Sequence, residues 1–143
     1  MLEVIIEING SVNTQVRYQT EPYGRDDWQT PAETSVLGTG DCEDIAIAKY
    51  VALRERDYQP ELVYCLWADP RTQRRIAHMI CVVGTLVLDN IAGEVKTVEE
   101  RQDLNLIYAI SHRGLRNWGQ DKLFPVRQHN RFHELVRRLE RGA

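Results

Sequence analysis

The stretch GDCEDIAIAKYVALRE, residues 40–55, gives the clearest structural signal in the chain. Asp41 stands at a helix N-cap position, where its carboxylate can accept a hydrogen bond from a first-turn amide. Asp44, three residues further on, completes a capping-box pattern, and acidic side chains suit the positive end of the helix dipole. The residues that follow are strong helix formers and apolar around most of the circumference. The stretch therefore predicts a helix that begins at Asp41, ends near Asp57 and is buried on more than one side.

Apolar patterning on either side of this helix predicts an α+β fold in a single domain, residues 1–143. Helical spacing favours helices at residues 2–16, from Thr30-Pro31 onward and at residues 130–141, the last with a basic surface face. For the first segment a strand is the alternative, because the β-branched run Val4-Ile5-Ile6 would suit one equally. Gly and Pro residues make most of the segment 20–40 a loop. After Pro60 short apolar runs predict strands at 62–68, 76–83, 85–89, 106–110 and around Leu115.

Composition excludes several classes of protein. The 143 residues carry 18 Lys and Arg against 21 Asp and Glu, a net charge of −3 with no basic cluster, which argues against a general nucleic-acid binder. The longest apolar run, residues 62–68, is too short to span a bilayer. Glu3 and Glu7 stand where a secretory signal needs basic residues, so no export signal is visible. The cysteine count of three is odd, so at least one cysteine is unpaired within the chain.

Cys42 occupies the first turn of the expected helix, directly after a Gly-Asp pair. The free amides and positive dipole there favour a thiolate, which predicts a lowered thiol pKa and a nucleophile; the same amides can hold an oxyanion. The alternative for a lone cysteine is a small buried apolar residue. Cys65 and Cys81 suit that alternative better, because one lies in the most apolar run and the other points to the opposite strand face from His78.

His78 and Asp89 are expected to lie close together. A two-residue turn at Gly84-Thr85 pairs Ile80 with Asp89 and places Asp89 diagonally beside His78, within reach of a hydrogen bond. A carboxylate on one imidazole nitrogen fixes the tautomer and leaves the other nitrogen for the cysteine proton. The alternative is two polar residues that are merely near each other, and a different turn length would shift the register.

Three carboxylates flank the cysteine, those of Asp41, Glu43 and Asp44. Like charges raise the pKa of a thiol, so the acids oppose its activation. Ca²⁺ would account for all three, since it binds clustered carboxylate oxygens. The alternative is helix capping alone.

The string GDCEDIAIAKYVALRE, followed by AHMICVV and VLDNIAG, resembles the bacterial transglutaminase-like cysteine proteinases, the LapG-type family. The resemblance extends from VNTQVRY through WQTPAE and RQDLNLIYAIS to near Trp118, which is most of the chain. It implies a papain-like, transglutaminase-like α+β core in which the nucleophile helix packs on an antiparallel β-sheet.

Residue by residue, the resemblance implies a catalytic triad of Cys42, His78 and Asp89. It also implies Ca²⁺ held by the acids around the cysteine, which are Asp41, Glu43 and, as a third, Asp44. Family members are typically periplasmic proteases that release large surface adhesins by cutting near paired alanines. An adhesin-like protein substrate, a regulatory inner-membrane protein and a periplasmic location are therefore implied.

The chain also departs from the family pattern. It begins close to the family's second helix, without the upstream segment and signal, which makes the cytoplasm the alternative location. Asp57 replaces the usual glycine after the nucleophile helix, and Leu106 replaces the proline expected after RxDLx.

These observations predict a calcium-dependent cysteine endopeptidase. Cys42 is the expected nucleophile, and His78 is the general base and then the general acid. Asp89 is the carboxylate that orients the imidazole, and Asp103 is the next candidate for that role. Trp28 either walls the cleft or packs in the core. Two alternatives remain: an acyl-transferring transglutaminase, which shares these residues, and a non-catalytic calcium-binding module of the same fold.

Overall fold

The computed structural model describes residues 2–19 and 28–141, and it has the predicted α+β architecture. Its helices are α1 (Leu2–Gln15), α2 (Pro31–Leu37), α3 (Cys42–Glu55), the 3-10 helix η1 (Val126–Gln128) and α4 (Asn130–Glu140). Its strands are β1 (Arg17–Tyr18), β2 (Thr39–Gly40), β3 (Glu61–Ala68), β4 (Arg75–Val83), β5 (Leu86–Leu88), β6 (Lys96–Thr97), β7 (Leu104–Ser111) and β8 (Gly114–Asn117). The loop predicted before α2 falls mostly on residues 20–27, outside the described residues.

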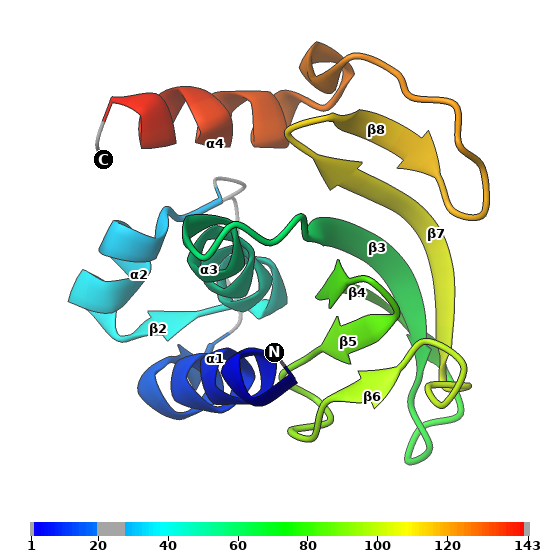
Figure 1. The fold of residues 1–143 in the computed structure, drawn as a ribbon. Helices are drawn as coiled ribbons and strands as arrows, with labels where there is room; N and C mark the ends of the chain where they lie inside the picture. Colours follow the sequence, from blue (N-terminus) through cyan, green and yellow to red (C-terminus); the bar gives the residue numbers. More distant parts are fainter. Residues whose placement is uncertain (1, 20–27, 142–143) are drawn as a thin grey trace.

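An antiparallel six-stranded sheet, in the order β6-β5-β4-β3-β7-β8, forms one layer of the fold. Figure 1 shows α3 at the centre, with the sheet curving past one side and α1, α2 and α4 around the others. The short parallel pair β1–β2 was not predicted from the sequence. Within the described residues no helix is long and apolar enough to cross a membrane.

The α3 helix forms where the capping pattern predicts it. Asp41 Oδ1 accepts from the Asp44 amide at 3.0 Å, and Asp44 Oδ2 accepts from the Asp41 amide at 3.1 Å. The side chains of Ile47, Tyr50 and Leu53 are fully buried, as the apolar circumference of the helix predicts. Asp57, just beyond the helix, has a left-handed φ of 66°, which explains why a glycine suits this position.

Each face of the sheet buries one of the cysteines predicted to lie in the core. Cys81 packs with Leu62 on the face covered by α3, whereas Cys65 packs with Ile80 in a separate cluster. Both thiols are fully buried, which confirms the prediction.

The β4–β5 hairpin has the predicted register. Val83 pairs with Leu86, Val82 with Val87 and Cys81 with Leu88, around a two-residue turn in which Gly84 has a φ of 60°. Extending this register by one pair places Asp89 opposite Ile80, although β5 itself ends at Leu88.

Candidate active site

His78 and Asp89 form a buried hydrogen-bonded pair, as the hairpin register predicts. Nε2 of His78 lies 2.6 Å from Oδ1 of Asp89, and both side chains are almost inaccessible to solvent. The Ile91 amide donates to the same oxygen at 3.2 Å, and Nδ2 of Asn13 on α1 donates to the Asp89 carbonyl at 2.9 Å. Side-chain and backbone contacts therefore both hold the aspartate in place.

The charge of Asp89 determines the tautomer of His78. Burial raises the pKa of Asp89, but hydrogen bonds and charge from His78 and then Arg101 outweigh it and lower that pKa to about 2. An ionised carboxylate can only accept, so Nε2 of His78 carries the hydrogen. In the neutral ring, Nδ1 of His78 is then left with a lone pair, which can accept a proton from a thiol.

Arg101 is a buried member of the site that the sequence reasoning missed. Its Nη2 donates to Oδ2 of Asp89 at 2.9 Å, and its Nε donates to Oδ1 of Asp103 at 2.9 Å. The RQD spacing was the available signal, because a buried arginine needs carboxylate partners. Asp103, the alternative orienter, bonds Arg101, and no bond from it to His78 occurs among the described residues.

Cys42 is the first residue of α3 and is partly buried. The prediction that its pKa is lowered is wrong: burial, the largest cause, raises the pKa of Cys42 to about 12. A backbone hydrogen bond from Met79 lowers the pKa, and the charges of Asp41, Glu43 and Asp89 raise it again. The resting side chain is therefore a thiol, which needs a base when it reacts.

The contact with Met79 places the Cys42 thiol beside β4, one residue past His78. Among the described residues no direct hydrogen bond joins this thiol to the imidazole. The structure thus brings His78 and Asp89 into contact and places Cys42 next to them.

The three acids around Cys42 do different things. Both oxygens of Asp44 accept backbone amides, one from Gln29 at 2.9 Å and one from Asp41 at 3.1 Å, and burial followed by the charge of Asp41 raises the pKa of Asp44 to about 7. Oε2 of Glu43 lies 3.7 Å from Nη1 of Arg131. In the described part of the chain no group of three or more His, Cys, Asp or Glu side chains is arranged to hold a metal. The predicted trio is therefore not one ligand cluster: Asp41 and Asp44 cap the helix together, and Glu43 pairs with Arg131. The carboxylates of Asp41 and Glu43 are nevertheless hard oxygen ligands of the kind that Ca²⁺ binds.

Lys49 is a second feature that the sequence reasoning missed. It projects from α3 into the interior with no exposed surface, and its Nζ has no hydrogen-bond partner in the described structure. Burial lowers the pKa of Lys49 to about 8, against the charges of Asp89 and Cys81, which raise it.

The structure confirms the prediction that Trp28 packs in the core, and the prediction that it walls the catalytic cleft remains a prediction. It is buried in the core cluster and also lines a cavity of about 320 Å³. Glu43 and Met79, the chain neighbours of Cys42 and His78, line the same cavity. This cavity therefore lies beside the candidate nucleophile and base.

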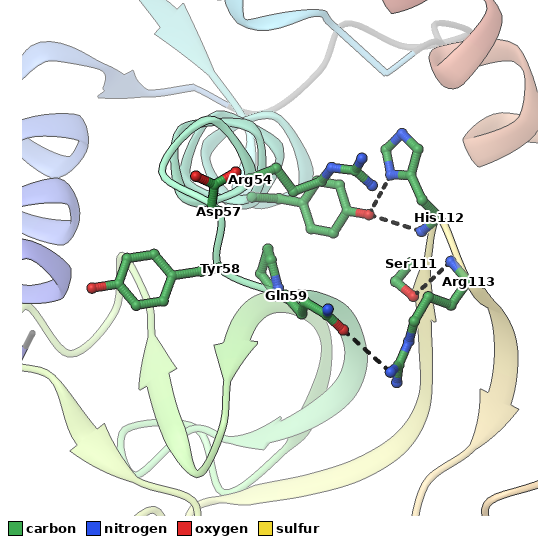
Figure 2. Close-up of a pocket in the computed structure, with 9 residues that line it drawn as sticks. Arg54, Asp57, Tyr58, Gln59, Ser111, His112 and Arg113 are labelled. Carbon is green, nitrogen blue, oxygen red and sulfur yellow. Dashed lines mark hydrogen bonds between the residues drawn. The ribbon is translucent and has the colours of Figure 1, made fainter.

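A second cavity, of about 360 Å³, lies at the carboxyl end of α3, away from Cys42 (Figure 2). The Tyr50 hydroxyl accepts from the His112 amide at 2.9 Å and lies 2.6 Å from Nδ1 of the same histidine. Arg113 donates to Oε1 of Gln59 at 3.3 Å on the other side of the cavity. None of the predicted catalytic or metal-binding residues lines it.

A cysteine at the start of a helix, packed on an antiparallel sheet that carries a bonded His-Asp pair, defines a cysteine peptidase with a papain-like core. The chain belongs to the family of bacterial transglutaminase-like cysteine proteinases, whose family model matches residues 1–120.

Solved structures agree with this membership. EGTA-treated LapG of Legionella pneumophila is 25% identical with a TM-score of 0.83, over 97% of this chain and 80% of that one. Calcium-bound LapG of the same organism is 26% identical with a TM-score of 0.79, over 97% and 81% of the two chains. A putative cysteine protease of Cytophaga hutchinsonii, 11% identical with a TM-score of 0.51 over 87% of this chain and 48% of that one, shares the fold. The comparison with curated proteins gave no match.

Proposed function

We propose that the protein is a calcium-dependent cysteine endopeptidase that works through Cys42, His78 and Asp89. The observation that carries the proposal is the buried 2.6 Å bond between His78 and Asp89 beside the first turn of α3. This bond leaves Nδ1 of His78 as the free base on the side of the reaction.

The proposed reaction has two steps. In the first, Sγ of Cys42 attacks the peptide carbonyl carbon while its proton passes to Nδ1 of His78, and the same proton then goes to the departing amine. In the second, His78 takes a proton from water, the hydroxide attacks the thioester, and Cys42 leaves with the proton returned. Asp89 stabilises the imidazolium in both steps, and Arg101 holds Asp89 ionised.

The amide of Cys42 is the proposed donor to the oxyanion. It belongs to the first turn of α3, where backbone amides lack partners within the helix. Such donors stabilise the negative charge that develops on the carbonyl oxygen during attack.

Asp41 and Glu43 are the proposed Ca²⁺ ligands, and Asp44 supports Asp41 through the capping box. When bound, the ion would supply positive charge beside the carboxylates of the first turn. The similarity to a LapG structure in its calcium-bound form supports the assignment. Ca²⁺ should raise the melting temperature relative to EGTA, and a variant with Asp41→Asn and Glu43→Gln should lose the increase. A matched variant with Asp121→Asn and Glu99→Gln should keep it; an unchanged melting temperature in the parent protein would refute the assignment.

An adhesin-like surface protein is the proposed substrate, with an inner-membrane protein as regulator and the periplasm as location. Family membership supports these assignments. Cell fractionation checks the location, and recovery of the protein in the cytoplasmic fraction would contradict it.

Thiol labelling tests the catalytic assignment. Iodoacetamide near neutral pH should label Cys42 in the folded protein, the labelling should be lost in His78→Ala, and Cys65 and Cys81 should react only after unfolding. Equal reactivity of all three cysteines would refute an activated thiol and favour a binding module.

A glutamine-bearing peptide with a labelled amine separates hydrolysis from acyl transfer, and amine incorporation that exceeds hydrolysis would identify a transglutaminase.

A further inference from the structure

Tyr108 and His129 form a wall between two adjoining cavities. One is the 320 Å³ cavity beside Cys42, and the other, of about 460 Å³, is lined on its far side by Leu115 and Phe124. Tyr108, His129 and Gln128 line both. The two cavities therefore adjoin at these three residues, with Glu43 and Met79 lining the first and the apolar Leu115 and Phe124 lining the second.

The sheet register gives the distance from the reacting groups to this wall. Met79 of β4 pairs with Tyr64 of β3, and Tyr64 pairs with Tyr108 of β7. Because neighbouring strands are about 4.8 Å apart, the Tyr108 backbone lies about 10 Å from Met79, whose backbone contacts the Cys42 thiol. An extended peptide covers that distance in about three residues.

The hydrogen bonds of His129 determine whether the Tyr108 hydroxyl donates or accepts in its bond with the imidazole. Its Nδ1 accepts from the Phe132 amide at 3.2 Å, so Nδ1 carries no hydrogen. In the neutral ring Nε2 must carry it, and Nε2 lies 3.1 Å from the Tyr108 hydroxyl oxygen. The imidazole is therefore the donor in this bond, and the Tyr108 oxygen is the acceptor. The phenolic hydrogen of Tyr108 is donated to no acceptor among the described residues.

Ring contacts hold the two rings that carry this hydrogen bond in place. The Tyr108 ring stacks on Tyr64, with centroids 5.2 Å apart and an interplanar angle of 16°. The His129 ring lies 5.1 Å from Trp28. A donor held rigidly at a cavity edge costs little further entropy when it binds a ligand.

We propose that Tyr108 and His129 form a substrate subsite, an inference that rests on the proposed peptidase function. The Tyr108 hydroxyl donates to a backbone carbonyl of an extended peptide, two to three residues from the scissile bond. The adjoining apolar cavity at Leu115 and Phe124 takes a large apolar side chain of the same peptide. Tyr108 is a positioning residue here, because it touches the substrate away from the reacting atoms.

A peptide library tests this subsite. A tryptic digest of a bacterial proteome is incubated with the enzyme, and the new termini are identified by mass spectrometry. The wild-type enzyme should show enrichment of Leu, Ile, Met or Phe at one position two to three residues from the cut. One cleaved peptide then serves as a fluorescence-quenched substrate.

Tyr108→Phe should raise the KM of that substrate about fivefold, the value of one neutral hydrogen bond, with kcat within twofold. A peptide truncated before the subsite should be cleaved equally by both enzymes, which a purely structural defect would not produce. Tyr58→Phe, the same change at the cavity of Figure 2, is the control and should leave both constants unchanged. Cleavage by the wild type with an unchanged KM in Tyr108→Phe would refute the subsite alone. Absence of any cleavage and of selective Cys42 labelling would refute the proposed function and the subsite with it.

Discussion

Replacement of Asp89 by asparagine tests the orienting role with little change of shape. Arg101 can only donate, so the amide oxygen must face its Nη2, where Oδ2 of Asp89 accepts at 2.9 Å. The amide NH₂ then faces Nε2 of His78, where the present distance is 2.6 Å. Two donors cannot meet there, so the hydrogen of His78 moves to Nδ1, which can no longer take the proton of Cys42.

The expected loss follows from this change of tautomer. Inverting the histidine tautomer in a Ser-His-Asp triad costs about 10⁴ in kcat, which corresponds to about 5.4 kcal/mol. The effect on stability is smaller. The pKa of Asp89 is about 2 against an ordinary 3.8, a difference worth about 2 kcal/mol at neutral pH. Since domains are stable by about 5–15 kcal/mol, Asp89→Asn should remain folded.

The pH dependence of unfolding checks the contribution of the ionised Asp89 to stability. The folded-state pKa of Asp89 is lowered, so its contribution is present above about pH 4 and is lost as the pH falls toward 2. Urea unfolding of the wild type and of Asp89→Asn should therefore differ at pH 7 and converge near pH 2.

The control is Asp103→Asn, because Asp103 bonds Arg101 and is 38% exposed. It should lose less than tenfold in kcat toward a quenched peptide. Turnover of Asp89→Asn within tenfold of the wild type would refute the tautomer argument. A larger loss in Asp103→Asn would transfer the orienting role to that residue.

Two further substitutions examine the buried charges. Arg101→Met leaves the Asp89 carboxylate buried without its cation and should cost about 3–5 kcal/mol in urea unfolding, more than Arg101→Lys; equal stability of the two variants would contradict this. Lys49→Met should raise the melting temperature at pH 7, because a pKa lowered from 10.5 to about 8 represents about 3 kcal/mol of unfavourable burial. The unfolded chain binds the Lys49 proton more tightly, so the stability deficit of the wild type relative to Lys49→Met should shrink as the pH rises from 8 to 10.5. The raised thiol pKa values act equally in both proteins and cancel in this difference; a deficit that does not change with pH would contradict the argument.

The parts of the site that could be predicted from the sequence are those fixed by short-range rules. The capping box of Asp41 and Asp44 fixes where α3 begins, and so where Cys42 lies in its first turn. The two-residue turn at Gly84 fixes the β4–β5 register, and through it the contact between His78 and Asp89.

The remaining parts depend on tertiary contacts. Arg101 meets Asp89 only because β6 returns beside β5, and no local pattern shows that return. The helix dipole predicts a lowered thiol pKa for Cys42, but burial against β4 is the larger effect. The prediction from the sequence grouped Asp44 with the metal ligands, because the sequence cannot show that the Gln29 amide donates to Oδ1 of Asp44.

A bulge in β7 positions the proposed subsite independently of the pair His78 and Asp89. Cys65 pairs with Leu106, whereas Tyr64 pairs with Tyr108, so Ile107 is an extra residue in β7. If the pairing of Cys65 with Leu106 continued along the strands without the bulge, Tyr64 would pair with Ile107. Tyr108 would then point to the opposite face of the sheet. The bulge therefore places the Tyr108 hydroxyl on the face where Met79 meets Cys42, whereas the bond between His78 and Asp89 depends only on the β4–β5 hairpin. The proposed subsite and the bond between His78 and Asp89 thus rest on separate features of one sheet, so we expect substitutions on β7 to change the preferred peptide without disturbing that bond.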